Sequence, residues 1–327
     1  MNKKITVALL SGGISSERGV SIKSGDQVFQ FLDKEKYHVL RYDPGTDIPK
    51  LISDASRIDI ALIMLHGPYG EDGTVQGLLD LLNIPYQCSG VLGSAVAMNK
   101  LVSKHLYEQA GIPVPAYLAL AAHDKIDMED CFRRLGTPLV VKPVCGGSSI
   151  GTTIVGSPDE LADAVASAFA HDDNILMETF IRGMEITGAV IGNSDIEALP
   201  LVEIVPSSDH GFFDYSAKYD DVETNEICPA RLPADVTETA QELAVRAHRA
   251  LFCKGYSRTD MIVKDGVVYV LETNTIPGMT TASLLPRAAE KAGMTFPMLL
   301  DRLIELGRER RLQAGRGVVE KSLRKGV

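Results

Sequence analysis

The sequence lacks three features that would assign it to large classes of protein. It has no basic excess, because 33 Lys and Arg stand against 43 Asp and Glu, a net charge of −10, and nucleic-acid-binding proteins usually carry a basic face. It has no apolar run long enough to cross a bilayer, and the apolar run at 5–10 stops too soon for a signal peptide. Its five cysteines are scattered, without the CxxC pair or His/Cys cluster typical of zinc sites. We therefore expect a cytoplasmic protein with reduced thiols that binds neither nucleic acid nor membrane.

The sequence does contain a regular alternation of strand and helix patterns. Its 327 residues are enough for two or three domains. Near the start, strand-like runs at 5–10, 38–43 and 58–65 alternate with helical periodicity at 20–33 and 74–83. This βαβ pattern predicts a parallel sheet over the first 98 residues.

The rest of the chain divides into two further α/β or α+β units. Helices are expected at 99–110, near 127–135 and at 234–252, and the pattern from 184 onward is mostly strands. Ser157, followed by Pro158 and Glu160, predicts a helix that begins with a capping box. We predict domains at 1–98, 99–183 and 184–313, with weak periodicity from Arg308 and a flexible tail at 314–327.

A glycine-rich loop separates two predicted strands in VVKPVCGGSSIGTTIV (140–155). Its glycines would let backbone N–H groups approach a phosphate, and Lys142 with Ser148 and Ser149 could add contacts to the phosphate oxygens. The segment is neither a P-loop nor a dinucleotide-binding fingerprint, because both lead into a helix. An ordinary glycine-rich hairpin is the alternative, and the loop alone does not decide between the two.

Oxygen-bearing side chains end the last two predicted strands. If SRTDMIV and VVYVLETN pair across the turn signal Lys264-Asp265-Gly266, the side chains of Asp260, Glu272 and Asn274 share one region, because residues two apart in a strand point to the same face. Such hard ligands suit Mg²⁺, whose coordination nucleotide phosphates and water would complete. Arg258 faces the same way and could stabilise negative charge in a transition state. The alternative is a solvated hairpin with one Arg–Asp pair.

Five motifs, in order along the chain, resemble one family. They are LHGPYGEDGTVQGLL, VVKPVCGGSSIG, DYSAKY, RTD and LETNTIPGMT, and together they resemble the D-alanine–D-alanine ligases of the ATP-grasp superfamily. The resemblance runs from VALLSGGISSERGVS to about Leu306. It implies a three-domain α/β ATP-grasp architecture with an N-terminal parallel-sheet domain.

The family resemblance also implies a reaction. The carboxylate of one D-alanine attacks the γ-phosphate of ATP, and the amine of a second D-alanine displaces phosphate from the acyl phosphate through a tetrahedral intermediate. The resemblance further implies Mg²⁺, as two ions for which Mn²⁺ can substitute, a homodimer, and a place in peptidoglycan precursor synthesis.

Individual residues match the family's site. The nucleotide contacts implied by the resemblance are Lys100, Lys142, Gly147, Ser149, Glu178, Thr179, Phe180, Ile181, Glu185 and Lys218. The metal ligands are Asp260, Glu272 and Asn274. The catalytic set is Glu17, Ser148, Tyr219, Arg258 and Gly278, and the substrate contacts are Glu17, His66, Arg258, Gly278, Ser283 and Leu284.

The matching residues have distinct expected roles. Glu17 would receive the ammonium group of the first D-alanine. Arg258 and the backbone N–H of Gly278 would form an oxyanion hole, and Ser148 and Tyr219 would form a hydrogen-bonded set with Glu17. His66, at the end of a buried strand, could instead be structural.

Other functions stay open from the sequence. The nearest is an ATP-grasp ligase with another second substrate, such as D-serine, and Ala282, next to the second subsite, leaves this specificity in doubt. Tyr219 favours D-alanine over D-lactate. A dehydrogenase would require a full GxGxxG motif after the first strand, and a non-catalytic nucleotide-binding regulator would be expected to have lost Lys218, Arg258 or Glu272.

Overall fold

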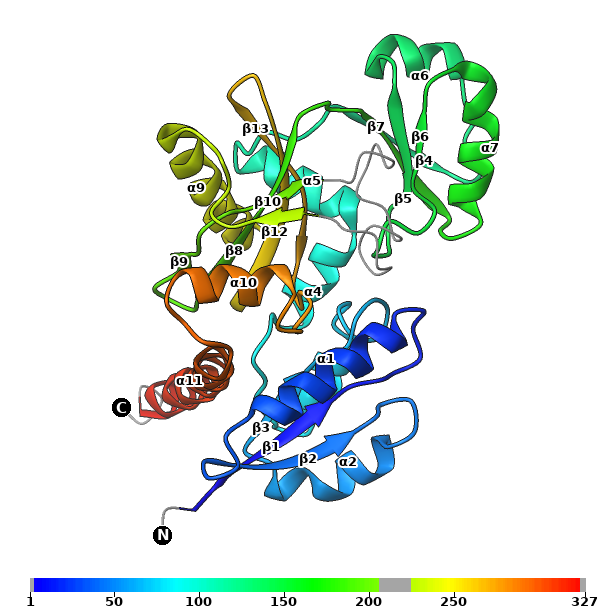
Figure 1. The fold of residues 1–327 in the computed structure, drawn as a ribbon. Coiled ribbons are helices and arrows are strands. Elements are labelled where there is room, and N and C mark those ends of the chain that lie inside the picture. The colour runs from blue at the N-terminus through cyan, green and yellow to red at the C-terminus, as the bar shows by residue number, and fades with distance from the viewer. Residues whose placement is uncertain (1–2, 206–224, 324–327) are drawn as a thin grey trace.

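A computed structural model describes residues 3–205 and 225–323, with side chains up to residue 309. Three sheets follow one another along the chain, and the N-terminal sheet lies apart from the other two (Figure 1). The expected α/β class with a parallel N-terminal sheet is confirmed.

The N-terminal sheet has three parallel strands in the order β2-β1-β3. These strands are β1 (Ile5–Leu10), β2 (Tyr37–Tyr42) and β3 (Ile60–Ile63), and the helices around them are α1 (Arg18–Phe31), α2 (Ile48–Asp54), the 3-10 turn η1 (Ala55–Arg57) and α3 (Thr74–Leu81). Every residue of β3 is buried, as expected for a strand covered on both faces.

The central sheet is antiparallel, in the order β4-β7-β5-β6. Two helices, α4 (Val91–Met98) and α5 (Lys100–Gln109), lead into it, and its elements are β4 (Tyr117–Ala121), α6 (Met128–Leu135), β5 (Leu139–Pro143), β6 (Thr153–Val155), α7 (Pro158–Phe169) and β7 (Asn174–Thr179). The helices α6 and α7 pack apolar side chains against this sheet to form one core. Because β5 and β6 pair directly, the glycine-rich loop joins two strands and does not open a helix.

The capping box predicted at the start of α7 does not form. Ser157 occupies the N-cap position, but its side chain makes no capping hydrogen bond. Glu160 Oε2 accepts a hydrogen bond from the backbone N–H of Gly156, one residue before the cap. The helix therefore begins where the sequence predicts, while the reciprocal bonds that define the box are absent.

The third sheet is antiparallel, in the order β11-β10-β8-β12-β13, with β9 paired to β8. Its elements are β8 (Met184–Gly192), β9 (Glu197–Ala198), β10 (Val202–Val205), β11 (Asn225–Ile227), α9 (Ala234–Ala250), β12 (Gly255–Lys264) and β13 (Val267–Asn274), followed by α10 (Leu284–Lys291). The predicted hairpin is confirmed, with Asp265 and Gly266 both at positive φ in the turn.

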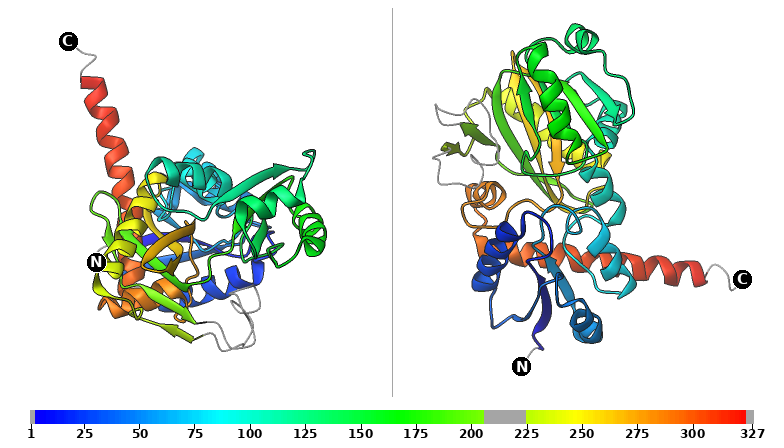
Figure 2. Two further views of the ribbon diagram at one scale, coloured as in Figure 1. Left: turned by 90° about the horizontal axis from the view of Figure 1, so that it is seen from above. Right: turned by 90° about the vertical axis from the view of Figure 1, so that its right-hand side faces the viewer.

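The last helix, α11 (Phe296–Leu323), differs from expectation in extent. Its first turns place Leu299, Leu303 and Leu306 in the same core as the N-terminal sheet, and it contacts β3. The backbone stays helical to Leu323, beyond the point at 308 where periodicity weakens, and the helix projects away from the sheets (Figure 2).

The cores do not follow the predicted domain boundaries strictly. Tyr107 of α5 packs into the core between α9 and the third sheet, although its sequence position lies in the predicted central domain. The boundaries at 98 and 183 remain predictions. In the described part of the chain, none of the helices has the length and apolar character needed to span a membrane.

Candidate active site

A cavity of about 480 Å³ lies between the central and third sheets. Its lining includes every described residue that the sequence predicts to bind nucleotide, namely Lys100, Lys142, Gly147, Ser149, Glu178, Thr179, Phe180, Ile181 and Glu185. Arg258, Asp260, Glu272 and Leu284 also line it. The tertiary structure thus brings residues from several strands, α5 and the glycine-rich loop around one space.

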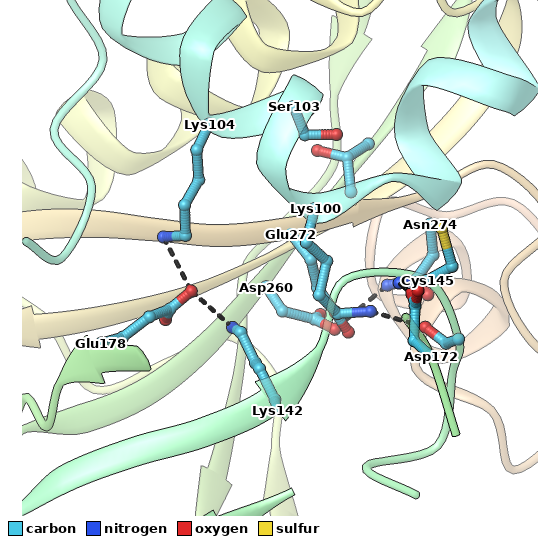
Figure 3. A network of polar contacts seen from close by, with 12 residues as sticks. Lys100, Ser103, Lys104, Lys142, Cys145, Asp172, Glu178, Asp260, Glu272 and Asn274 are labelled. Carbon is cyan, nitrogen blue, oxygen red and sulfur yellow. Dashed lines mark hydrogen bonds and ion pairs between the residues drawn. The ribbon is translucent and has the colours of Figure 1, made fainter. Parts of the chain in front are cut away.

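A buried carboxylate lies between two lysines at one side of the cavity (Figure 3). Glu178 Oε1 is 2.9 Å from Lys142 Nζ and 3.2 Å from Lys104 Nζ. Burial raises the pKa of Glu178, but the two ammonium groups outweigh it and hold the pKa below its usual range. Glu178 is therefore ionised at neutral pH.

Lys100 connects the glycine-rich loop to Glu272 of the β12–β13 hairpin. Its Nζ donates to the carbonyl oxygen of Gly146 and lies 3.5 Å from Glu272 Oε2. Asp172 supports the same loop by accepting a hydrogen bond from the backbone N–H of Cys145 at 2.6 Å. Two lysines, Lys100 and Lys142, therefore present positive charge to the cavity from different elements, as a polyphosphate site requires.

The acidic residues of the β12–β13 hairpin meet as the predicted pairing requires. Asp260 pairs with Glu272 across the strands, and Arg258 pairs with Asn274. Arg258 donates two hydrogen bonds to the Asp260 carboxylate, from Nε at 2.9 Å and from a terminal nitrogen at 2.8 Å. Asn274 Nδ2 and Thr187 Oγ1 donate to the same carboxylate, at 3.1 Å and 2.7 Å.

This donor set fits a hard divalent cation that phosphates help to hold. Asp260, Glu272 and Asn274 can offer oxygen ligands beside Lys100, and the two carboxylates line the cavity. Among the described residues no three His, Cys, Asp or Glu side chains form a complete metal cage. Two carboxylates and an amide suit Mg²⁺, which keeps water and phosphate among its ligands.

The glycine-rich loop reaches the N-terminal domain through Ser148. Ser148 Oγ donates a hydrogen bond to Glu17 Oε1, and both side chains are buried. Ser148 and Ser149 both have positive φ, a left-handed conformation that turns the loop sharply and is uncommon outside glycine. Glu17 is the residue before α1, but its side chain does not cap that helix; it is directed to the loop instead.

A second carboxyl group, Glu71, lies near Glu17 with Gly67 between them. Glu71 Oε2 accepts from the backbone N–H of Gly67 at 2.8 Å. Gly67 has φ +70°, and a Cβ there would lie 2.7 Å from Glu17 Oε2. Loss of hydration, and then the charge of Glu17, raise the pKa of Glu71 to about 8. Glu71 is therefore mostly protonated at neutral pH.

His66 lies at the edge of a second cavity, of about 280 Å³, in the N-terminal domain. Its ring is buried, with Nε2 3.4 Å from Ser24 Oγ. Burial lowers the pKa of His66 to about 4 against the opposing effect of the Ile276 backbone, so the ring is neutral at physiological pH. These contacts support the structural role of His66 that the sequence left open. The neutral ring can also donate a hydrogen bond to a substrate.

The predicted second subsite is a compact turn before α10. Ser283 Oγ lies 2.8 Å from Thr280 Oγ1 and 3.1 Å from the Thr280 backbone nitrogen, and a Cβ on Gly278 would lie 3.0 Å from it. The backbone N–H of Thr281 donates to Gln27 Oε1 of α1 at 2.6 Å. The N-terminal domain therefore helps to position this turn.

Two predicted site residues, Lys218 and Tyr219, lie outside the residues that the structure describes. Within the described residues, the site also contains groups that sequence reasoning missed. These are Lys104, Glu71 and Gln27, which act on site residues from other elements. Two of them carried a signal: Lys104 follows Lys100 by one helical turn, and Glu71 lies within the motif LHGPYGEDGTVQGLL.

Comparisons with known proteins agree with this geometry. Models described as D-ala D-ala ligase N-terminus and C-terminus match residues 42–89 and 106–305. A D-alanine–D-alanine ligase from Syntrophobacter fumaroxidans is 58% identical over 307 residues, covering 94% of this chain and 99% of the relative. The chain belongs to the D-alanine–D-alanine ligase family. It is an enzyme of the ATP-dependent ligase class.

Solved structures of the D-alanine–D-alanine ligase family and of a D-Ala:D-Ser ligase share the fold. The ligase from Bacillus anthracis complexed with ATP aligns with a TM-score of 0.83 at 37% identity, covering 95% of this chain and 99% of that one. The VanG D-Ala:D-Ser ligase from Enterococcus faecalis aligns with a TM-score of 0.80 at 32% identity, covering 93% and 100%. The ATP-grasp architecture expected from the motifs is thereby confirmed.

Proposed function

We propose that this ligase joins two D-alanine molecules through an acyl phosphate made from ATP, with the 480 Å³ cavity as its nucleotide site. One observation carries the proposal: the two lysines Lys100 and Lys142, the glycine-rich loop and the hairpin carboxylates Asp260 and Glu272 all line one cavity. The alternative dehydrogenase leaves these lysines and carboxylates without a role.

The chain's own residues would bind and orient the nucleotide. Lys100 and Lys142 would contact the α- and β-phosphates, backbone N–H groups of the loop would cover them, and Lys218 would neutralise the γ-phosphate. The segment from Glu178 to Ile181 would hold the adenine, and Glu185 the ribose. Asp260, Glu272 and Asn274 would hold Mg²⁺, or Mn²⁺ in its place, which when bound offsets charge on the phosphate oxygens.

The first D-alanine would lie between the loop and the N-terminal domain. Glu17 would receive its ammonium group, because its buried side chain lies beside the loop and the raised pKa of Glu71 keeps a second negative charge away. The Ser148 hydroxyl and Tyr219 would keep Glu17 in place, and His66, as a neutral ring, would contribute a hydrogen bond without repelling the ammonium group. The substrate carboxylate is then free to face the nucleotide.

The second step needs stabilisation of an oxyanion. When the amine of the second D-alanine attacks the acyl phosphate, negative charge develops on the former carbonyl oxygen. Arg258 and the backbone N–H of Gly278 would receive it, and Ser283 with Leu284 would position the second substrate. The bidentate pair with Asp260 supports this role, because it holds the Arg258 guanidinium at the cavity wall.

A cell-wall role follows from this chemistry. A D-alanyl-D-alanine product would supply peptidoglycan precursors in the cytoplasm, and the chain would work as a homodimer, as the family resemblance implies.

Phosphate release tests the substrate assignment, with D-alanine alone compared with D-alanine plus D-serine or D-lactate. Release with D-alanine alone and formation of the dipeptide are expected. A strong requirement for D-serine would assign the chain to the alternative specificity.

A further inference from the structure

Lys104 is a fully buried lysine that the proposed reaction does not use. Its side chain has no solvent exposure, and its Nζ lies 3.2 Å from Glu178 Oε1. The ring of Tyr117 lies 5.3 Å from the same nitrogen, close enough for a cation–π contact. A buried ammonium group is costly unless it is paired, so the position of Lys104 requires a reason.

The two lysines that share Glu178 have different surroundings. Lys142 comes from β5 and lines the cavity, whereas Lys104 comes from α5 and is not part of the cavity wall. Glu178 itself lines the cavity and lies between them (Figure 3). Lys142 can therefore contact a ligand in the cavity, whereas Lys104 is buried behind Glu178 and contacts its carboxylate.

The charges explain why two lysines are needed. Burial lowers the pKa of Lys104, and the charge of Glu178 opposes that shift. When both lysines are protonated, two ammonium groups and one carboxylate leave one net positive charge beside the cavity. If Lys142 directs that charge toward a nucleotide phosphate, its attraction to Glu178 weakens. Without Lys104, Glu178 would then be a buried and weakly paired carboxylate, which would take up a proton or move.

We propose that Lys104 is a positioning residue, a fixed counterion that keeps Glu178 ionised and in place while Lys142 pairs with the nucleotide phosphates. This inference rests on the proposed nucleotide site. An ionised carboxylate only accepts hydrogen bonds. The exocyclic amino group of adenine donates them, whereas hypoxanthine has a carbonyl oxygen in that place. Lys104 therefore contributes to the preference for ATP over ITP, without touching the nucleotide.

The test is a steady-state comparison of Lys104→Met with the wild-type enzyme. Methionine keeps most of the side-chain volume and removes the charge. The KM for ATP should rise about tenfold, as for loss of a buried ion-pair partner, and the ATP/ITP ratio of kcat/KM should fall about tenfold. The KM for D-alanine should change less than about twofold. Lys264→Met, at the exposed end of β12, is the control and should change none of these values.

A double-mutant cycle separates action through Glu178 from a general structural effect. In a Glu178→Gln background, Lys104→Met should cause no further rise in the KM for ATP, because there is no carboxylate left to hold. If Lys104→Met alone does not fold, ADP binding to Glu178→Gln is compared with ADP binding to the double variant, in which neither Lys104 nor Glu178 remains as a buried charge without the other. Equal affinities support the inference.

Three outcomes would overturn it. They are an unchanged KM for ATP in folded Lys104→Met, an unchanged ATP/ITP ratio, and a further tenfold loss of affinity in the double variant. A wild-type enzyme that neither binds nor hydrolyses ATP would instead remove the proposed function. The two failures are therefore distinguishable.

Discussion

The hydroxyl of Ser148 donates a hydrogen bond to the carboxylate of Glu17, although 131 positions separate the two residues. Ser148 belongs to the loop over the nucleotide cavity, and Glu17 to the domain proposed to hold the first amino acid. This contact couples the position of the loop to the position of the carboxylate. Binding of the two substrates should therefore not be independent.

Ser148→Ala should raise the KM for D-alanine about tenfold or more, because a hydrogen bond to a charged group contributes about 1.5–3 kcal/mol. Initial rates at varied D-alanine and saturating ATP would measure it. Ser157→Ala is a matched control, since Ser157 makes no capping bond. Equal KM values for the wild type and both variants would show that Ser148 does not contribute to D-alanine binding.

Gly67→Ala should impair D-alanine binding more than it impairs folding. The added Cβ would lie 2.7 Å from Glu17 Oε2 and must displace it. Gly266→Ala is the control, because Gly266 has a similar φ of +78° but nothing within 4 Å of the position that a Cβ would take, so the substitution adds only backbone strain of about 1 kcal/mol. The KM for D-alanine should rise in Gly67→Ala and not in Gly266→Ala, whereas backbone strain should lower the melting temperature of both variants. Identical KM values would contradict the expected displacement of Glu17.

Arg258→Ala should abolish dipeptide formation and leave ATP binding largely intact. Loss of one oxyanion donor lowers kcat by about 10²–10³. Dipeptide formation is followed in parallel with binding of a non-hydrolysable ATP analogue. Arg258→Lys keeps the charge but cannot form the bidentate pair with Asp260, and it should recover only part of the rate. Unchanged turnover in Arg258→Ala would exclude the oxyanion role.

Glu272→Gln should weaken the response of the enzyme to Mg²⁺. Removal of one anionic ligand should raise the Mg²⁺ concentration for half-maximal activity about tenfold or more. Asp265→Asn removes an exposed acid from the turn of the same hairpin and should leave the titration unchanged. Coincident Mg²⁺ titrations for Glu272→Gln and wild type would count against the metal site.

The stability of the protein should depend on pH through Glu71. Its pKa rises from an ordinary 4.5 to about 8 in the folded state, so between these values the native state binds one proton more than the unfolded state. Stability from this group is therefore present below pH 4.5 and is lost as pH rises through 8. The melting temperature of Glu71→Gln should fall less between about pH 5 and 8 than that of the wild type, with exposed Glu129→Gln as the control. Parallel curves would refute the assignment.

The sequence determined much of this protein by local rules. Apolar strand segments that alternate with helical segments specify the parallel sheet. An Asp-Gly turn specifies the hairpin that aligns Asp260 with Glu272. The family resemblance that the motifs carry predicted residues that the structure places around the 480 Å³ cavity, because strands and loops carry their side chains wherever the fold places them.

Other features depend on contacts between segments far apart in the chain. No local pattern could show that Glu178 pairs with both Lys104 and Lys142, since three separate elements supply them. The raised pKa of Glu71 likewise results from loss of hydration and from the nearby charge of Glu17. Chain neighbours decide which elements form, but burial and charge pairing between those elements decide the ionisation of the groups that carry the chemistry.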